Sequence, residues 1–350
     1  MPGKVMDRQT LLRRGALALP GLLLTAAVAR TILQRRGSPV RAEGTQLGVY
    51  SDESGGHTLS RLEFALGRRF TLQRINAAMT FDIPSRRDQN WADDGYRIYH
   101  NANAETVDAM PWGGGWASIA HGSEDDYFHR VAAALRAGTR FSSTDPFDLS
   151  LHHEQGVTSG AQCGVGCNGT PEDYKAFYRH VSDLFHQEEA TIDEGGPLRL
   201  VWTPTVAQFT TDGAVQAAAL DPDLGPDGSS VVGSYYHLLG VDMYSRLTTG
   251  GLSIADPTAA LAIVSTYAMA RGVPFVIGEY GCQDGSAPAQ HERKAEYLTT
   301  TATALKSFGT GPGGCEYWCY SHIGAGQNWL DSSPESLAAF TAIGQDPWFA

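Results

Sequence analysis

The sequence predicts an α/β protein built as a single-domain (β/α)8 TIM barrel, in which eight parallel strands alternate with helices around a closed ring. Three observations support this fold class. Short apolar segments typical of buried strands alternate with longer segments of helical periodicity. Residues 47–350 are enough for one such domain, which typically has about 250 residues plus loops. Two strand segments run into a glutamate, and enzymes of this fold place their catalytic groups at the carboxyl ends of the strands.

The expected strands are short apolar segments. In chain order they lie at residues 48–50, 72–81, 107–112, 148–153, 198–203, 238–244, 275–277 and 315–320. Strands that alternate with helices of this length imply a parallel sheet. Eight strands in this length favour a closed barrel over an open doubly wound sheet. No Gly-x-Gly-x-x-Gly follows the first strand, which removes the main signal of a dinucleotide site.

Helices are expected between the strands. Residues 125–137 have helical spacing, with apolar side chains on one face. Thr170 followed by Pro171 is a good N-cap with proline at the first helical position, and it opens a helix to about residue 189. Later helices are expected at residues 257–272, at residues 287–308 and from Ser333-Pro334 onward.

The first 29 residues have the pattern of a secretory signal peptide. Arg13 and Arg14 precede an apolar run over residues 15–29, which ends in Ala27-Val28-Ala29. A basic start, a short apolar segment and small residues at its end are typical of such a signal. The arginine pair indicates the twin-arginine export route of bacteria. The alternative is an uncleaved membrane anchor, but a span needs about 20 apolar residues.

We therefore expect cleavage near Ala29, a linker over residues 30–46 and a catalytic domain over residues 47–350. The protein would be secreted or periplasmic, outside the bacterial cytoplasm. After cleavage, no membrane is expected as a partner.

The body of the chain is acidic. The full chain carries 26 Lys and Arg against 38 Asp and Glu, and without residues 1–29 the numbers are 22 and 37, a net charge of −15. This balance argues against nucleic acid and anionic membrane as partners. It fits a neutral polysaccharide or oligosaccharide substrate, and we expect a monomer.

The chain has five cysteines, so at least one is unpaired within it. Cys163 and Cys167 flank a glycine-rich loop and could close a small disulfide in an exported protein. Cys282 lies on one predicted strand and Cys315 and Cys319 lie on the next, so either a bridge or buried free thiols are compatible with the sequence.

A metal or cofactor is not expected. His152 and His153 followed by Cys163 and Cys167 contain two possible types of ligand. Their spacing is not an established zinc pattern, and the simpler interpretation is a histidine at the rim with a loop disulfide.

Glu154 and Glu279 are the candidate catalytic residues. Each follows an apolar segment, and the strands are parallel, so both glutamates should lie at the same end of the barrel. The fourth and seventh strands lie on opposite sides of the ring, so the two side chains can face one another across a sugar. Two such carboxyl groups suit the hydrolysis of a glycosidic bond. A salt bridge at the rim is the structural alternative for either one, although a buried carboxylate is costly unless it is paired or functional.

Several further segments form a recognisable series of motifs. They are Ile119–Asp126, Pro146–Glu154, Val201–Pro204, Gly240–Tyr244, Pro274–Gly281 and Glu316–Trp318. The order and spacing of these segments resemble glycoside hydrolase family 26, which contains β-mannanases, with some β-1,3-xylanases and lichenases, on the (β/α)8 barrel of clan A. Together they cover roughly residues 47–345 of the chain.

The resemblance implies a role for each matching residue. Glu154 would be the general acid/base and Glu279 the nucleophile of a retaining double displacement. His153 would hydrogen-bond near the sugar, and Tyr244 would hydrogen-bond the nucleophile. Trp318 would be the floor beneath the sugar that is cleaved, because an aromatic face fits the C–H side of a pyranose.

The sequence departs from this family beside the catalytic acid. Gln155-Gly156-Val157 follows Glu154 where the family usually has Met-Asn-Gly, and Ser150 stands in place of an arginine. These departures support alternative hypotheses: a different glycan, a barrel hydrolase of another clan A family, or a non-catalytic carbohydrate-binding protein on a degenerate barrel.

Two tryptophans and one aspartate complete the set of candidates. Trp112 and Trp116 flank three glycines after the third expected strand, so they are either a sugar platform or ordinary core residues. Asp242 is expected to be structural, at a strand end. The Gly-x-Ser-x-Gly motif of nucleophile-elbow hydrolases does not occur in the chain.

Overall fold

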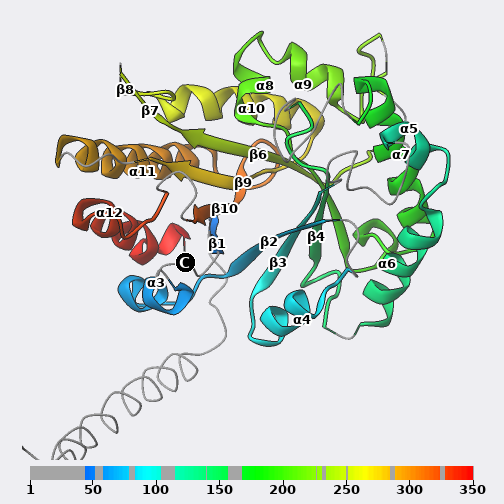
Figure 1. Ribbon diagram of the computed structural model, residues 1–350, viewed down its shortest axis with the longest axis horizontal. Helices are drawn as coiled ribbons and strands as arrows, with labels where there is room; N and C mark the ends of the chain where they lie inside the picture. Colours follow the sequence, from blue (N-terminus) through cyan, green and yellow to red (C-terminus); the bar gives the residue numbers. More distant parts are fainter. Residues whose placement is uncertain are drawn as a thin grey trace, which may run out of the picture. The chain divides into compact units, whose positions relative to one another are not determined.

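A closed barrel of eight parallel strands confirms the expected fold class (Figure 1). The computed structural model describes residues 44–51, 58–78, 83–103, 115–138, 140–156, 168–225, 227–230, 234–249, 251–283, 288–323 and 328–349. The expected signal peptide, the disulfide candidates Cys163 and Cys167, and Trp112 lie outside the described residues.

The barrel strands follow one another around the ring in the order of the chain. They are β1 (Gln46–Ser51), β2 (Leu72–Ala78), β3 (Arg97–Asn103), β4 (Phe147–Leu151), β5 (Leu198–Trp202), β6 (Leu238–Ser245), β9 (Phe275–Cys282) and β10 (Cys315–His322). Strand β10 pairs with β1, which closes the ring. A separate antiparallel pair, β7 (Leu247–Thr248) and β8 (Gly251–Leu252), follows β6.

Helices surround the barrel (Figure 1). They are α3 (Leu59–Leu66), α4 (Arg86–Asp93), α5 (Gly115–Ala120), α6 (Asp125–Ala137), α7 (Pro171–Gln187), α8 (Val206–Thr210), α9 (Val215–Leu220), α10 (Pro257–Arg271), α11 (Pro288–Phe308) and α12 (Pro334–Gln345). Thr170 caps α7 as expected, in a capping box with Asp173. No described helix is long and apolar enough to span a membrane.

The third strand differs from the expected one. Residues 107–112 lie outside the described residues, and the third strand is β3, at Arg97–Asn103. Polar residues conceal this strand in the sequence. His100 is fully buried, and its Nδ1 lies 3.0 Å from Asp88 Oδ1 on α4. A buried polar side chain is tolerated in a strand when it has such a partner.

The interior of the ring has an apolar layer and an ionic layer. Seven buried residues form the apolar layer: Leu72, Tyr99, Val201, Leu238, Val276, Tyr317 and Cys319. Arg97, Asp148, Arg199 and Glu316, each the first or second residue of its strand, form the layer at the amino ends. We call these four residues the basal cluster.

The three cysteines on the last two barrel strands are not joined to one another by a disulfide. Cys282, Cys315 and Cys319 are all buried, and no bridge joins them. The structure thus decides between the two alternatives that the sequence allowed for these residues.

Candidate active site

Glu154 lies in a turn whose backbone is strained. Its φ is +51° and that of His152 is +56°, a left-handed conformation that is uncommon for residues other than glycine and is often found at functional sites. Backbone hydrogen bonds hold this turn between the neighbouring strands. The Glu154 N–H donates to the carbonyl of Thr203 at 2.8 Å, and the His152 N–H donates to that of Ala102 at 2.8 Å.

Glu279 lies within β9, where its carboxylate accepts two hydrogen bonds and forms one close ion pair. Its Oε1 is 2.9 Å from Asn76 Nδ2 and 2.9 Å from Arg74 Nη2. Its Oε2 accepts from the hydroxyl of Tyr244 at 2.7 Å. The carboxylate is therefore fixed in orientation by one cation and two neutral donors, as a nucleophile requires.

Arg74 joins the acidic residues of the site. This side chain is fully buried on β2, and its Nη1 lies 2.9 Å from Asp242 Oδ1. Its guanidinium also lies over the ring of Tyr99, 4.9 Å from the centroid. Burial would raise the pKa of the Asp242 carboxyl, but Arg74 and His153 lower it below its usual value. Asp242 is thus ionised and paired, in agreement with the structural role expected for it.

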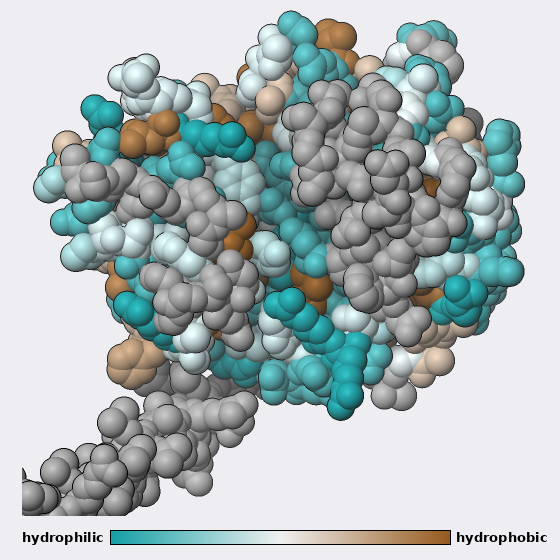
Figure 2. Space-filling view, viewed as in Figure 1, coloured by the Kyte–Doolittle hydropathy of each residue, from teal (hydrophilic) through white to brown (hydrophobic). Residues whose placement is uncertain are grey.

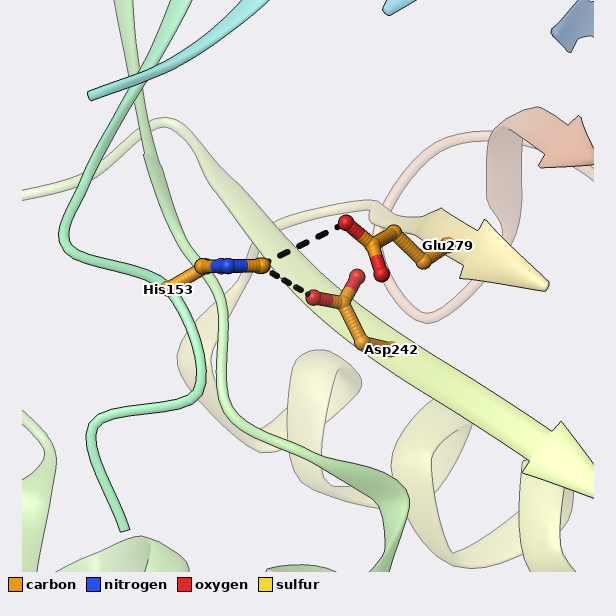
Figure 3. A group of neighbouring side chains, drawn as sticks. All are labelled: His153, Asp242 and Glu279. Atoms are coloured by element: carbon orange, nitrogen blue, oxygen red, sulfur yellow. Dashed lines mark hydrogen bonds and ion pairs between the residues drawn. The ribbon is translucent and has the colours of Figure 1, made fainter. Parts of the chain in front are cut away.

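His153 lies against both acidic partners of Arg74 (Figure 3). Its Nδ1 is 2.7 Å from Asp242 Oδ2 and 3.7 Å from Glu279 Oε1. The same nitrogen is 2.9 Å from Arg74 Nη2. A guanidinium group only donates hydrogen bonds, so Arg74 cannot accept the proton on His153 Nδ1. That proton is therefore donated to Asp242. Although burial alone would lower it, the pKa of His153 is raised by its carboxylate neighbours.

Glu154 has the opposite environment to Glu279. Burial, together with the negative charges of Asp242 and Glu279, raises the pKa of the Glu154 carboxyl to about 7, against the lowering effect of His153 and Arg74. A carboxyl with this pKa holds its proton for part of the time near neutral pH and can act as an acid. We call Arg74, His153, Glu154, Asp242 and Glu279 the mouth cluster.

Three of these residues have the spacing of metal ligands. One ligand atom from each of His153, Asp242 and Glu279 lies within 4.8 Å of the others. Arg74 already supplies a cation among them, with contacts of 2.9 Å to all three residues. The arginine thus accounts for the grouping, and the absence of a metal stays a prediction.

Trp318 is a packing residue on the outer side of the barrel wall. Trp318 is 1% exposed on the outer face of β10, where it packs against Tyr280, Phe340 and Phe349. The expectation that it forms the sugar floor is therefore wrong. Side chains alternate along a strand, and the inward positions of β10 belong to its neighbours Tyr317 and Cys319.

Trp116 is likewise a packing residue. It is fully buried on α5, and its ring lies 5.2 Å from that of His152 and 5.0 Å from that of Tyr174 on α7. Of its two alternatives, the structure favours the core residue over the sugar platform. Gln155, the unusual residue after Glu154, is also fully buried.

Sequence reasoning did not identify Arg74, Asn76 and Ser321. Arg74 and Asn76 occupy alternate positions of β2, and the hydroxyl of Ser321 on β10 lies 2.7 Å from that of Tyr244. A charged residue inside an apolar strand was the available signal for Arg74.

In the space-filling view, hydrophilic residues predominate on the described part of the face shown (Figure 2).

Solved structures with a similar fold include mannanases of glycoside hydrolase family 26. The catalytic domain of an endo-β-1,4-mannanase from Bacillus sp. JAMB-750 is 16% identical, with a TM-score of 0.59 over 93% of this chain and 89% of that one. A modular endo-β-1,4-mannanase from Cellulomonas fimi is 18% identical, with a TM-score of 0.58 over 92% of this chain and 75% of that one.

A third solved structure, GH26C from Muricauda sp. MAR_2010_75, is 13% identical, with a TM-score of 0.59 over 93% of this chain and 90% of that one. At the level of the fold, these similarities agree with the resemblance that the motifs indicated. No protein-family model matches the chain, and no curated protein matches it by sequence.

Proposed function

We propose that this protein is a retaining glycoside hydrolase that cleaves a β-linked polysaccharide such as β-mannan. The observation that carries the proposal is the contrast between two carboxyl groups in one mouth. Glu279 is held by two hydrogen-bond donors and an ion pair with Arg74, whereas the pKa of Glu154 is raised to about 7. Pairs of titratable groups with such different environments are typical of acid/base assignments.

In the first step, Glu279 attacks the anomeric carbon while the glycosidic bond breaks. The departing oxygen takes the proton of Glu154. In the second step, Glu154 removes a proton from water, the water oxygen bonds to the anomeric carbon, and the bond to Glu279 breaks. Two inversions retain the configuration of the sugar. We assign His153 and Tyr244 to binding beside the reacting carbon, because each has an atom within 4 Å of the nucleophile.

The substrate class rests on the solved structures and on charge. Two of the three similar structures named above are endo-β-1,4-mannanases, and an acidic chain suits a neutral glycan. Export rests on the sequence of residues 1–29 alone. Fractionation of the bacterial cells, with Arg13 and Arg14 replaced by lysine as the comparison, tests that part of the proposal.

A carbohydrate-binding protein without activity is the second candidate. Gln155 favours it, because this residue differs from the resembled family directly beside the acid and its amide is fully buried. This candidate predicts that sugar binds without release of new reducing ends.

Hydrolysis of a glycan panel decides between the two candidates. The panel contains β-mannan, xylan, mixed-linkage β-glucan and bacterial exopolysaccharide, and the readout is new reducing ends. We expect cleavage of at least one glycan, a loss of about 10²–10⁴-fold in kcat for Glu154→Ala and a larger loss for Glu279→Ala.

Glu172→Ala is the matched control, because the side chain of Glu172 is 67% exposed on α7. Full activity of both active-site variants on the cleaved glycan would contradict the proposal. Tight binding of a glycan that is never cleaved would favour the second candidate.

A further inference from the structure

The two oxygens of the Glu279 carboxylate are held in different ways. Oε1 accepts a hydrogen bond from Asn76 Nδ2 at 2.9 Å and forms an ion pair with Arg74 Nη2 at 2.9 Å, and both side chains come from neighbouring inward positions of β2. Among the described residues, Oε2 accepts only from the hydroxyl of Tyr244, at 2.7 Å. Oε1 is therefore the more firmly anchored oxygen, and Oε2 is the one whose partner has to change when a new bond forms there.

The hydroxyl of Tyr244 has a second partner within reach. Ser321 Oγ, fully buried on β10, lies 2.7 Å from it. Burial raises the pKa of Tyr244 well above its usual value, so the hydroxyl keeps its proton and remains a donor. The hydroxyl of Tyr244 has one hydrogen, so it donates to either Glu279 or Ser321 at a given moment. While it donates to Glu279, it can accept a hydrogen bond from the hydroxyl of Ser321.

We propose that Oε2 of Glu279 is the oxygen that attacks the sugar, and that Ser321 is a positioning residue that takes over the hydrogen bond of Tyr244 once Oε2 is bonded to carbon. The inference rests on the proposed function and adds to it a residue that does not touch the substrate.

The proton and electron balance follows from the double displacement. When a lone pair of Oε2 forms the bond to the anomeric carbon, the electrons of the old glycosidic bond leave with the departing oxygen, which is protonated by Glu154. Oε2 becomes the alkyl oxygen of an ester and loses its charge, so it accepts a hydrogen bond poorly. Oε1 becomes the ester carbonyl and keeps the donors Arg74 and Asn76.

The Tyr244 hydroxyl then needs another acceptor, because a buried donor without one destabilises the state in which it occurs. Rotation of the hydroxyl toward Ser321 supplies that acceptor without movement of the tyrosine ring. When water releases the sugar, Oε2 regains its charge and the hydrogen bond returns to it. Ser321 thus stabilises the covalent intermediate relative to the free enzyme.

The test measures the formation and the decay of the intermediate separately. The probe is the dinitrophenyl glycoside of a mannobiose that carries fluorine beside the anomeric carbon, which forms the intermediate and releases it slowly. For Ser321→Ala we expect Glu279 to be labelled about five- to tenfold more slowly. The trapped intermediate should be hydrolysed at an unchanged or faster rate, because it is less stable. A general structural defect would slow both steps.

Three variants serve as controls. Ser182→Ala removes an equally buried hydroxyl on α7, one that donates to the carbonyl of Tyr235 at 3.3 Å, and should change neither rate by more than twofold. In a Tyr244→Phe background, Ser321→Ala should have no further effect, because Ser321 acts through that hydroxyl. Ser321→Cys keeps the volume with a weaker acceptor and should lie between wild type and Ser321→Ala, so it serves where the alanine variant folds poorly.

The outcomes separate this inference from the proposed function. If the wild-type protein is labelled at Glu279 but Ser321→Ala is labelled at the wild-type rate, or if both steps slow equally, the role of Ser321 is overturned and the proposed function stands. If the effect of Ser321→Ala persists without the Tyr244 hydroxyl, the role of Ser321 is also overturned. If wild type cleaves no glycan and is never labelled, both are overturned.

Discussion

The two ends of the barrel each contain a cluster of buried charge, and the clusters differ in balance. In the basal cluster, Asp148 lies 2.7 Å from Arg199 and 3.0 Å from Arg97. Glu316 lies 2.8 Å from Arg97 and 2.9 Å from Arg199. Two arginines thus pair with two carboxylates. In the mouth cluster, Arg74 and His153 face three carboxyl groups, and Glu154 is the one whose pKa is raised to about 7.

This difference indicates what buried charge does in this fold. In the basal cluster every carboxyl group contacts both arginines, so the arginines equal the carboxyl groups in number, although burial raises the pKa of Asp148 to about 8 against the lowering effect of Arg97. The mouth cluster has one carboxyl group more than its two cationic side chains, and the additional group, Glu154, has a pKa of about 7 and lies in a strained turn. Burial by itself does not indicate function, whereas an uneven charge balance in an accessible mouth does.

Replacement of Arg74 by methionine should have the largest effect. Asp242 and Glu279 would be left buried without their cation, which costs about 3–5 kcal/mol in the free energy of unfolding. The loss of a donor to the nucleophile should also lower kcat by at least about 100-fold. Urea unfolding and assays on the cleaved glycan measure the two effects. A variant as active as wild type would show that the mouth cluster is no more functional than the basal one.

The same substitution at the other end, Arg199→Met, is the matched test. Asp148 and Glu316 would each lose one arginine, so we expect a similar loss of about 3–5 kcal/mol in the free energy of unfolding. The kcat of the folded protein should stay within about threefold of wild type, because no basal residue contacts the mouth cluster among the described interactions. A loss of activity equal to that of Arg74→Met would break the comparison.

The pH dependence of kcat/KM sharpens the comparison further. The acid must be protonated in the free enzyme, and the pKa of Glu154 is about 7. Activity should therefore fall as the pH rises above about 7. On the same glycan Arg199→Met should keep this decline, whereas the residual activity of Glu154→Gln should not show it. A decline at the same pH in Glu154→Gln would assign it to another group.

The smallest effect is expected for Trp318→Phe. Because Trp318 packs between β10 and α12, the change should destabilise the protein by about 1–2 kcal/mol. The KM for the cleaved glycan should stay within about twofold of wild type, as the ring does not reach the mouth cluster. A large rise in KM with unchanged stability would restore the sugar-floor role.

The sequence predicted the barrel and the two glutamates because both follow from short-range patterns. Apolar segments that end on Glu154 and Glu279 are visible without knowledge of the contacts, and Tyr244 lies on the sixth expected strand, next to that of Glu279. Arg74 was not predicted, because its role depends on contacts with residues 79 to 205 positions away.

Trp318 and Ser321 illustrate a second reason why part of the site could not be predicted from the sequence. On β10 the inward and outward faces differ by one residue, so a strand that is located correctly can still present the wrong side chain. Nothing in the apolar pattern of residues 315–320 distinguishes the two faces. The third strand was misplaced for a related reason, because partners on other elements make the polar residues of β3 acceptable in a buried strand.

The anomeric configuration of azide products tests the central claim most directly, namely that Glu154 and Glu279 have separate roles. Each glutamate is replaced by alanine, and the variant is given dinitrophenyl β-mannobioside with azide in excess. In Glu154→Ala, azide should attack the covalent intermediate and yield the β-glycosyl azide. In Glu279→Ala, azide should attack the substrate from the side of the missing carboxylate and yield the α-glycosyl azide. The same anomer from both variants, or the reverse assignment, would contradict the account.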